Sequence, residues 1–145
     1  MTKIYAHLTG VGSYLPEKIV KNNDLPESLN TSDEWIRERT GITQRHIAAD
    51  NQTTSELGYE AAKAAIDDAG LTPDDIDLIV VATSTPDYTF PSTATIIQER
   101  LAIHHGAAFD LQAVCSGFIY GIHVVEKLIR AVSYTHLTLP TILLV

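Results

Sequence analysis

Apolar positions along the chain alternate between short continuous runs and helical spacing. The run at 76–82 is almost unbroken and rich in β-branched residues, which predicts a strand buried on both faces. Residues 3–12 and 107–113 are predicted as two further short strands. Because predicted helices separate these runs, the pattern indicates an α/β fold with βαβ units around a mostly parallel, buried sheet.

The first predicted helix spans 32–39 and is marked at both ends. Thr31 and Glu34 stand in capping-box spacing at its start, and Gly41 follows its last turn. Two arginines in that last turn suit the negative end of the helix dipole.

A second predicted helix is delimited in the same way. Thr53 and Glu56 have capping-box spacing, and Gly70 stands at the C-terminal side. Small residues on one face would let this helix lie close to the element that it covers. The predicted buried face consists of Leu57, Ala61, Ala65 and Ala69, flanked by Ala62 and Ile66.

The C-terminal third contains two more predicted helices and a tail of different character. Ser92 is the expected N-cap of a helix over 92–101, and the helix over 116–130 is apolar on almost every side, so we expect it to be buried. Residues 132–145 contain no Asp, Glu, Lys or Arg and end in an apolar run. We expect residues 1–131 to form one structural region and 132–145 to be a truncated or non-native tail.

Length and composition fit one globular domain. The chain has 145 residues, 45% hydrophobic and 19% charged, enough to bury roughly 68–70% of its unfolded surface. The formal net charge of −8 argues against nucleic acid and anionic membranes as partners. One cysteine, no signal-like start and no apolar run of membrane-spanning length predict a cytoplasmic protein without a transmembrane helix.

The single cysteine, Cys115, lies where the predicted strand over 107–113 meets the last helix. Free N–H groups and the positive end of the helix dipole favour an anion there, so this thiol should ionise readily and act as a nucleophile. The turn could also supply N–H groups to an oxyanion. The alternative is that Cys115 is a small buried hydrophobic residue, and the local pattern leaves both open.

No histidine stands out as the base for such a nucleophile. His123 follows Cys115 by eight residues, about 12 Å along a helix, which is too far for a hydrogen bond. The adjacent pair near residue 104 has no further ligand at metal-binding spacing, so no metal is predicted. We interpret the histidines mainly as solvated surface residues; they are His7, His46, His104, His105, His123 and His136.

Trp35, Arg37, Arg39 and Thr40 form a second cluster, on the first predicted helix and just after it. An indole ring and guanidinium groups suit a nucleotide, through base stacking and phosphate binding. The alternative is that Trp35 buries its ring and the arginines only favour the helix C-terminus. Residues 10–12 begin a glycine fingerprint that lacks its third glycine, so a dinucleotide cofactor is not expected.

Four segments in this order resemble the β-ketoacyl-acyl-carrier-protein synthase III family: GVGSYLP at 10–16, TSDEWIRERTGI at 31–42, RHIA at 45–48 and FDLQAVCSGF at 109–118. The resemblance runs over residues 3–130. It implies a thiolase-like fold, in which two similar βαβ halves form a five-layered αβαβα protein. This chain would supply the first half.

The resemblance also implies the chemistry. Cys115 would take an acyl group, typically acetyl, from acyl-coenzyme A as a thioester. Malonyl-acyl-carrier-protein would then lose carbon dioxide and attack that thioester, which is the first condensation of fatty-acid synthesis. No tightly bound cofactor is implied, since acyl-coenzyme A is a substrate.

Further site residues follow from the same resemblance. Trp35 would stack on the adenine of coenzyme A, with Arg39, Thr31 and Thr40 near its nucleotide end. Phe90 would lie at the acyl pocket and at the subunit contact of a homodimer.

Some features of the family have no match in the chain. The histidine and asparagine that stabilise its carbanion belong to the second half, so we expect this chain to be acylated at most and not to condense. Residues 132–137 resemble a translated transposon end used in sequencing libraries, which supports a non-native tail. A polyketide-type or hydroxymethylglutaryl-type synthase, or a non-catalytic remnant that binds acyl-coenzyme A, remains an alternative.

Overall fold

The computed structural model describes residues 5–131 and the backbone of residues 137–138. The described chain forms two compact units. The larger unit contains residues 5–14 and 53–131 together with the short backbone segment near the C-terminus, and the smaller unit contains residues 15–52.

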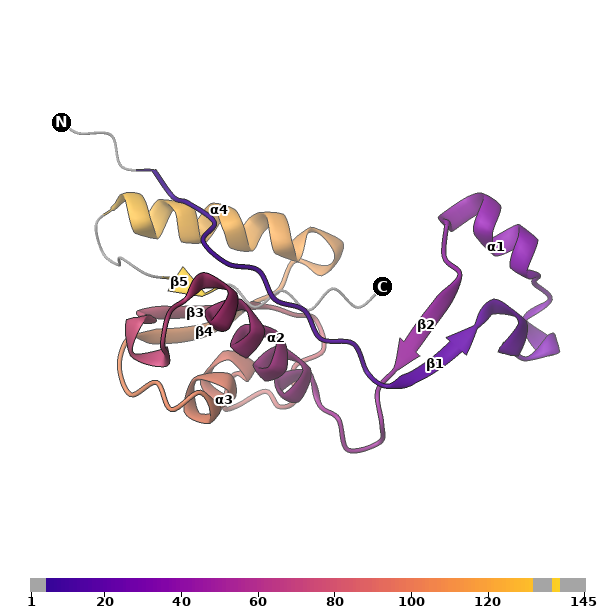
Figure 1. Ribbon diagram of the computed structural model, residues 1–145, viewed down its shortest axis with the longest axis horizontal. Coiled ribbons are helices and arrows are strands. Elements are labelled where there is room, and N and C mark those ends of the chain that lie inside the picture. Colours follow the sequence, from indigo (N-terminus) through magenta and orange to yellow (C-terminus); the bar gives the residue numbers. More distant parts are fainter. Residues whose placement is uncertain (1–4, 132–136, 139–145) are drawn as a thin grey trace. The chain divides into compact units, whose positions relative to one another are not determined.

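A three-stranded parallel sheet forms the centre of the larger unit (Figure 1). Its strands are β3 (Leu78–Ala82), β4 (Ala107–Leu111) and β5 (Leu137–Thr138), in the order β4-β3-β5. The register places Val80 of β3 beside Phe109 of β4. The strands predicted over 76–82 and 107–113 are therefore confirmed over 78–82 and 107–111, within a parallel sheet as expected; β3 is buried and β4 is half-buried.

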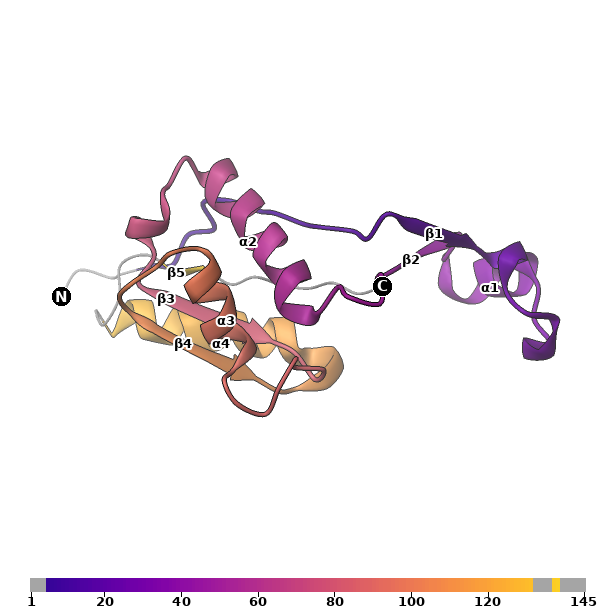
Figure 2. The same ribbon diagram turned by 90° about the horizontal axis from the view of Figure 1, so that it is seen from below.

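Helices cover both faces of this sheet (Figures 1 and 2). Helices α2 (Thr54–Ala69) and α3 (Thr93–Arg100) lie on one face, and α4 (Gly117–Arg130) lies on the other. This layering confirms the α/β architecture that the alternating sequence pattern predicts.

The core of the larger unit is apolar and lies between β3 and the pair α2 and α3. Ile79 and Val81 face these helices, while Leu78 and Val80 alternate toward the opposite face, and all four side chains are fully buried or nearly so. The cluster on the α2 and α3 side contains Ala62, Ile66, Ile76, Ile79, Val81, Ala94, Ile97, Leu101 and Ile103.

Helix ends in the larger unit follow the predicted caps. Thr53 accepts a hydrogen bond from the Glu56 amide at 3.4 Å, and Gly70 ends α2 in the left-handed region with a φ of 67°. Ser92 accepts from the Thr95 amide at 3.2 Å and starts α3. These boundaries could be predicted because each depends on side chains within four residues.

The predicted buried face of α2 is confirmed in part. Ala65 and Ala69 are half-buried, whereas the remaining predicted positions are buried. A Cβ atom added to Gly10 would lie 2.8 Å from the Ala69 Cβ, so the N-terminal segment passes close to the helix. The small side chains of α2 permit this approach, as expected from the sequence.

The predicted strand over 3–12 is wrong, because the described residues 5–12 contain no strand. The amide of Val11 donates instead to Asp68 Oδ2 at 2.9 Å. This segment therefore directs a backbone donor to a side chain of α2 rather than to a neighbouring strand.

The last helix is also more exposed than its sequence predicts. Gly117 and Gly121 are buried, and a Cβ atom at Gly117 would lie 3.2 Å from the Ala82 Cβ, so this side of α4 lies against β3. Among the described residues, no element covers the opposite side, and the expectation of burial all round is wrong. The exposed apolar residues of α4 are Phe118, Ile119, Tyr120 and Ile122.

The smaller unit combines a two-stranded antiparallel ribbon with a short helix. Strand β1 (Lys18–Lys21) pairs with β2 (Gln44–Ile47), and α1 (Asp33–Thr40) lies between them in sequence. The sequence pattern did not predict this ribbon, because both strands have only four residues and neither contains a buried one.

Helix α1 begins one residue later than predicted. Ser32, not Thr31, is the N-cap, and its Oγ accepts from the Trp35 amide at 3.1 Å. The two hydroxyl residues are adjacent, and the extended backbone at Ser32 directs its side chain to the first turn. Gly41 ends the helix with a φ of 73°, as predicted.

The predicted tail, 132–145, lies outside the described residues except for the backbone of β5. Its non-native origin therefore stays a prediction. Within the described part of the chain, no helix has both the length and the apolar composition needed to cross a membrane.

Candidate active site and nucleotide-binding helix

Cys115 stands in a tight turn that joins β4 to α4. A short 3-10 helix, Val114–Ser116, is closed by a hydrogen bond from the Ser116 amide to the Ala113 carbonyl at 3.0 Å. Val114 has a φ of 46°, a left-handed conformation that β-branched residues rarely adopt. Such local strain recurs where a fold presents a functional side chain.

The thiol of Cys115 is exposed, so the alternative that it is a small buried hydrophobic residue is wrong. Ser116, the residue before α4, makes no side-chain capping hydrogen bond. The start of a 14-residue helix therefore lies directly after the sulfur, with no capping side chain on its first-turn amides. The role of Cys115 as a nucleophile stays a prediction.

Asp110, near the end of β4, makes contacts that the sequence did not predict. Its carboxylate accepts hydrogen bonds from the backbone amides of Thr93 and Ala94, both at 2.8 Å. Helix α3 has no acidic residue in its own first turn, so Asp110 supplies the negative charge that the N-terminus favours. One carboxylate thus connects the first turn of α3 with the strand that leads to Cys115.

Phe90 lies in the loop before α3, three residues before Thr93. Its side chain is 88% exposed in the described structure. The predicted roles of Phe90 at an acyl pocket and at a dimer contact both stay predictions.

The described histidines resemble surface residues more than catalytic bases. His46 is the exception, since it is half-buried with its Nδ1 at 2.6 Å from the Pro16 carbonyl oxygen. His136 lies outside the described residues. Within the described part of the chain, no group of three His, Cys, Asp or Glu side chains could hold a metal ion. The exposed histidines are His7, His104, His105 and His123.

An apolar pocket of about 400 Å³ also lies within the larger unit. It is bounded by the N-terminal segment, α2 and α4, and Phe118 and Ile122 contribute to its wall. Cys115 is not among its lining residues, so this pocket is separate from the predicted nucleophile.

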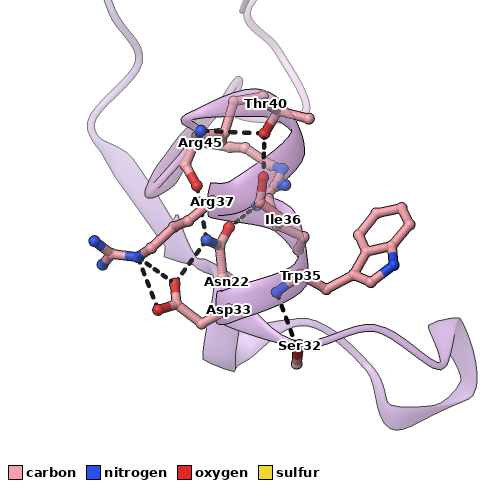
Figure 3. Close-up of polar contacts among 9 residues, drawn as sticks. Asn22, Ser32, Asp33, Trp35, Ile36, Arg37, Thr40 and Arg45 are labelled. Carbon is pink, nitrogen blue, oxygen red and sulfur yellow. Dashed lines mark hydrogen bonds and ion pairs between the residues drawn. The ribbon is translucent and has the colours of Figure 1, made fainter.

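Trp35 and Arg39 form a pair on the surface of the smaller unit. The Arg39 guanidinium lies 4.5 Å from the centroid of the Trp35 ring, a cation–π contact. Trp35 projects away from α1 and is 51% exposed (Figure 3), so the alternative that its ring is buried is wrong. Thr31, the other predicted residue before the helix, is exposed as well.

Two other residues of the predicted cluster are engaged within the unit. Arg37 forms an ion pair with Asp33, with Nε at 2.7 Å from Oδ2. The Thr40 hydroxyl donates to the Ile36 carbonyl at 2.7 Å and accepts from the Ile42 amide at 3.1 Å. These contacts stabilise both ends of α1, whereas Trp35 and Arg39 remain available to a ligand.

Hydrogen bonds also shift a carboxyl group beside the pair. The Arg37 guanidinium, and after it the Asn22 amide, hold the pKa of Asp33 below its usual value. Asp33 is therefore ionised at neutral pH and can accept both hydrogen bonds.

Comparisons with known proteins agree with the motifs. No family model matches the chain. The chain is 61% identical over 121 residues to β-ketoacyl-acyl-carrier-protein synthase III of Mesorhizobium japonicum. The matched region covers 83% of this chain and 38% of that protein. The chain belongs to the β-ketoacyl-acyl-carrier-protein synthase III family. It corresponds to part of the N-terminal half and spans about 40% of the length of the curated relatives that it matches.

Solved structures confirm the predicted thiolase-like fold class. The synthase III of Aquifex aeolicus superposes with a TM-score of 0.79 at 44% identity, covering 85% of this chain and 40% of that one. A priming β-ketosynthase from a polyketide biosynthetic pathway superposes with a TM-score of 0.88 at 31% identity, covering 94% of this chain and 41% of that one.

Proposed function

We propose that this chain supplies the nucleophile and the nucleotide-binding helix of a synthase III-type condensing enzyme. The observation that carries the proposal is the exposed Cys115 at the start of α4, in a chain of this family. The first-turn amides of α4 stabilise a thiolate and the oxyanion that forms when it attacks a carbonyl.

The proposed reaction has two steps. The Cys115 thiolate attacks the thioester carbonyl of acyl-coenzyme A, forms an S-acyl bond and releases the coenzyme A thiolate. Malonyl-acyl-carrier-protein then loses carbon dioxide, and the resulting carbanion attacks the Cys115 thioester. The carbon–sulfur bond breaks, the Cys115 thiolate returns, and the product is a β-ketoacyl group on the carrier protein.

Coenzyme A recognition is assigned to α1 and the residues beside it. The exposed indole of Trp35 would stack on adenine through one face while Arg39 occupies the other. Arg39 and the hydroxyls of Thr31 and Thr40 would lie near the nucleotide end. The exposure of Trp35 supports this assignment, because a stacking platform must be accessible.

Phe90 is assigned to the acyl pocket and to the contact between two subunits of a homodimer. Its 88% exposure supports a role that another segment or subunit completes, since large aromatic side chains favour burial. The resemblance implies that the carbanion-stabilising histidine and asparagine of the family come from its second half. We therefore expect the 145-residue chain to accept an acyl group without condensing it.

A polyketide-type synthase is the second proposal, favoured by the similarity to the priming β-ketosynthase. It uses the same nucleophile with a different acyl group. A hydroxymethylglutaryl-type synthase and a non-catalytic remnant that binds acyl-coenzyme A predict other outcomes of the same experiment.

The test is acylation of the chain by radiolabelled acyl-coenzyme A. Incubation with labelled acetyl-coenzyme A should place a thioester on Cys115, identified by peptide mass spectrometry and released by hydroxylamine. Cys115→Ser should abolish the label, while the matched surface change Ser84→Ala should leave it intact. Label that persists in Cys115→Ser rejects the nucleophile, and coenzyme A binding without any label favours the non-catalytic remnant. Stronger labelling by longer acyl groups favours a polyketide-type synthase.

A further inference from the structure

Asn22 is a buried polar side chain in a unit that buries little else. It is 4% exposed and begins the short 3-10 helix Asn22–Asp24, which follows β1. In the smaller unit, the only other buried residues are Pro16 and Ile36. A buried amide is stable only if its donors and acceptor are satisfied.

The side chain of Asn22 makes hydrogen bonds to three segments (Figure 3). Its Nδ2 donates to Asp33 Oδ1 at 2.7 Å and to the Ile42 carbonyl at 2.8 Å. Its Oδ1 accepts from Arg45 Nη1 at 2.9 Å. Both amide hydrogens and the carbonyl oxygen are therefore engaged.

These contacts hold both ends of α1. Asp33 is the first residue of the helix, and Ile42 follows the residue that ends it. Arg45 belongs to β2, so the same side chain also connects α1 to the ribbon. Asp33 in turn binds Arg37, one helical turn later.

Apolar packing alone gives α1 little support. The helix has eight residues, a length that is marginal in isolation, and Ile36 is its only buried side chain. One buried side chain leaves the helix free to rotate about its contact. The hydrogen bonds of Asn22 remove that freedom at two separate points.

We infer that Asn22 is a positioning residue that holds α1 in the orientation from which Trp35 and Arg39 bind the nucleotide end of coenzyme A. The inference rests on the proposed function for its ligand. Asn22 does not act on the ligand directly, because its donors and acceptor are used within the unit.

The test uses the fluorescence of Trp35, the single tryptophan of the chain. The 145-residue chain is titrated with coenzyme A, and Kd is taken from the change in emission. For Asn22→Ala we expect Kd to rise about tenfold, because the variant loses all three hydrogen bonds that orient α1. Without ligand, the fluorescence anisotropy of Trp35 should fall, because the helix moves more freely.

Asn23→Ala is the matched control, since Asn23 is the exposed neighbour in the same 3-10 helix. It should leave both Kd and anisotropy unchanged. A second variant, Asn22→Asp, keeps the size of the side chain and an acceptor for Arg45. It replaces the donor facing Asp33 with an acceptor, so Kd should again rise about tenfold or more.

The outcomes separate positioning from general stability. Unchanged helical circular dichroism with a higher Kd and lower anisotropy supports the inference. A Kd and an anisotropy equal to those of Asn23→Ala overturn it. Loss of the helical signal in both Asn22 variants also overturns it, because that result indicates a purely structural role. If the unchanged chain does not bind coenzyme A, the proposed nucleotide site fails, and the anisotropy without ligand still decides the role of Asn22.

Discussion

The two units of this chain are stabilised by opposite means. In the larger unit, β3 is an apolar strand whose first four side chains are buried, and α2 and α3 pack against it through aliphatic residues. In the smaller unit, the buried amide of Asn22 and its three hydrogen bonds take the place of such a core. Apolar burial tolerates small shifts of its partners, whereas hydrogen bonds fix distance and direction. The predicted nucleophile therefore lies on a packed scaffold, and the predicted nucleotide site lies on a polar one.

The largest effect is expected from a cavity in the packed unit. Ile97 of α3 is fully buried, so Ile97→Ala should lower the free energy of unfolding by about 2–5 kcal/mol. Guanidinium denaturation followed by circular dichroism measures the loss. Ile119→Ala is the matched control, because Ile119 is 65% exposed, and it should change stability by less than about 0.5 kcal/mol.

The same variant tests whether the two units are independent. If they are, the fluorescence transition of Trp35, which lies in the smaller unit, should keep its midpoint in Ile97→Ala. A shift of the Trp35 transition equal to that of circular dichroism would contradict the comparison, since both units would then unfold as one.

A smaller loss is expected where the packed unit depends on a polar contact. Asp110→Ala removes the acceptor of the Thr93 and Ala94 amides and should cost about 1–3 kcal/mol of unfolding free energy. Hydrogen exchange of these two amides should accelerate in the variant. Asp50→Ala, at an exposed carboxylate, is the control. Unchanged exchange in Asp110→Ala would show that solvent or another group replaces the carboxylate at no cost.

Local signals explain which parts of the fold could be predicted from the sequence. The caps at Thr53, Ser92 and Gly70 act within four residues, and the apolar run of β3 reports burial on both faces directly. The ribbon of β1 and β2 has no such run, and its pairing spans more than twenty residues. The exposure of α4 depends on what lies beside the helix, which periodicity does not contain.

The candidate site divides in the same way. Cys115 and Trp35 could be found from residue type and position, because a lone thiol before a helix and an indole on a capped helix are visible along the chain. The roles of Asp110 and Asn22 could not be found from residue type and position. Asp110 accepts from amides sixteen and seventeen residues away, and Asn22 binds residues eleven to twenty-three positions later. Such contacts exist only after folding.

A modest effect is expected at the exposed pair of the smaller unit. Arg39→Gln removes the cation from the Trp35 ring and should weaken that contact by about 0.5–1 kcal/mol. The emission spectrum of Trp35 should change, while the melting temperature of the larger unit stays constant. Arg37→Gln, which breaks the ion pair with Asp33 instead, should alter the Trp35 spectrum less. Identical spectra in both variants would show that the Arg39 contact does not persist in solution.

The smallest effect concerns one half-buried carboxylate in each unit, Glu126 and Asp33. Hydrogen bonds from Lys127 and then Arg130 lower the pKa of Glu126 from 4.5 to about 2, and Arg37 and then Asn22 lower that of Asp33. A carboxyl whose pKa is lower in the folded state stabilises the protein above its unfolded pKa. For Glu126 that contribution is complete above pH 4.5 and disappears as the pH falls toward 2.

Carboxyl carbon chemical shifts, followed by NMR between pH 2 and 7, measure both groups without unfolding the chain. Arg130→Gln should raise the pKa of Glu126 and leave that of Asp33 unchanged. Asn22→Ala should raise the pKa of Asp33 and leave that of Glu126 unchanged. Added salt should raise the pKa of Glu126, because both of its partners are charged and open to solvent. It should raise the pKa of Asp33 less, because only Arg37 is charged there and the second partner, Asn22, is a neutral donor. If salt raises both pKa values equally, the polar contacts of the smaller unit are screened by solvent as much as ordinary surface ion pairs are. The contrast between the two units would then be confined to their cores.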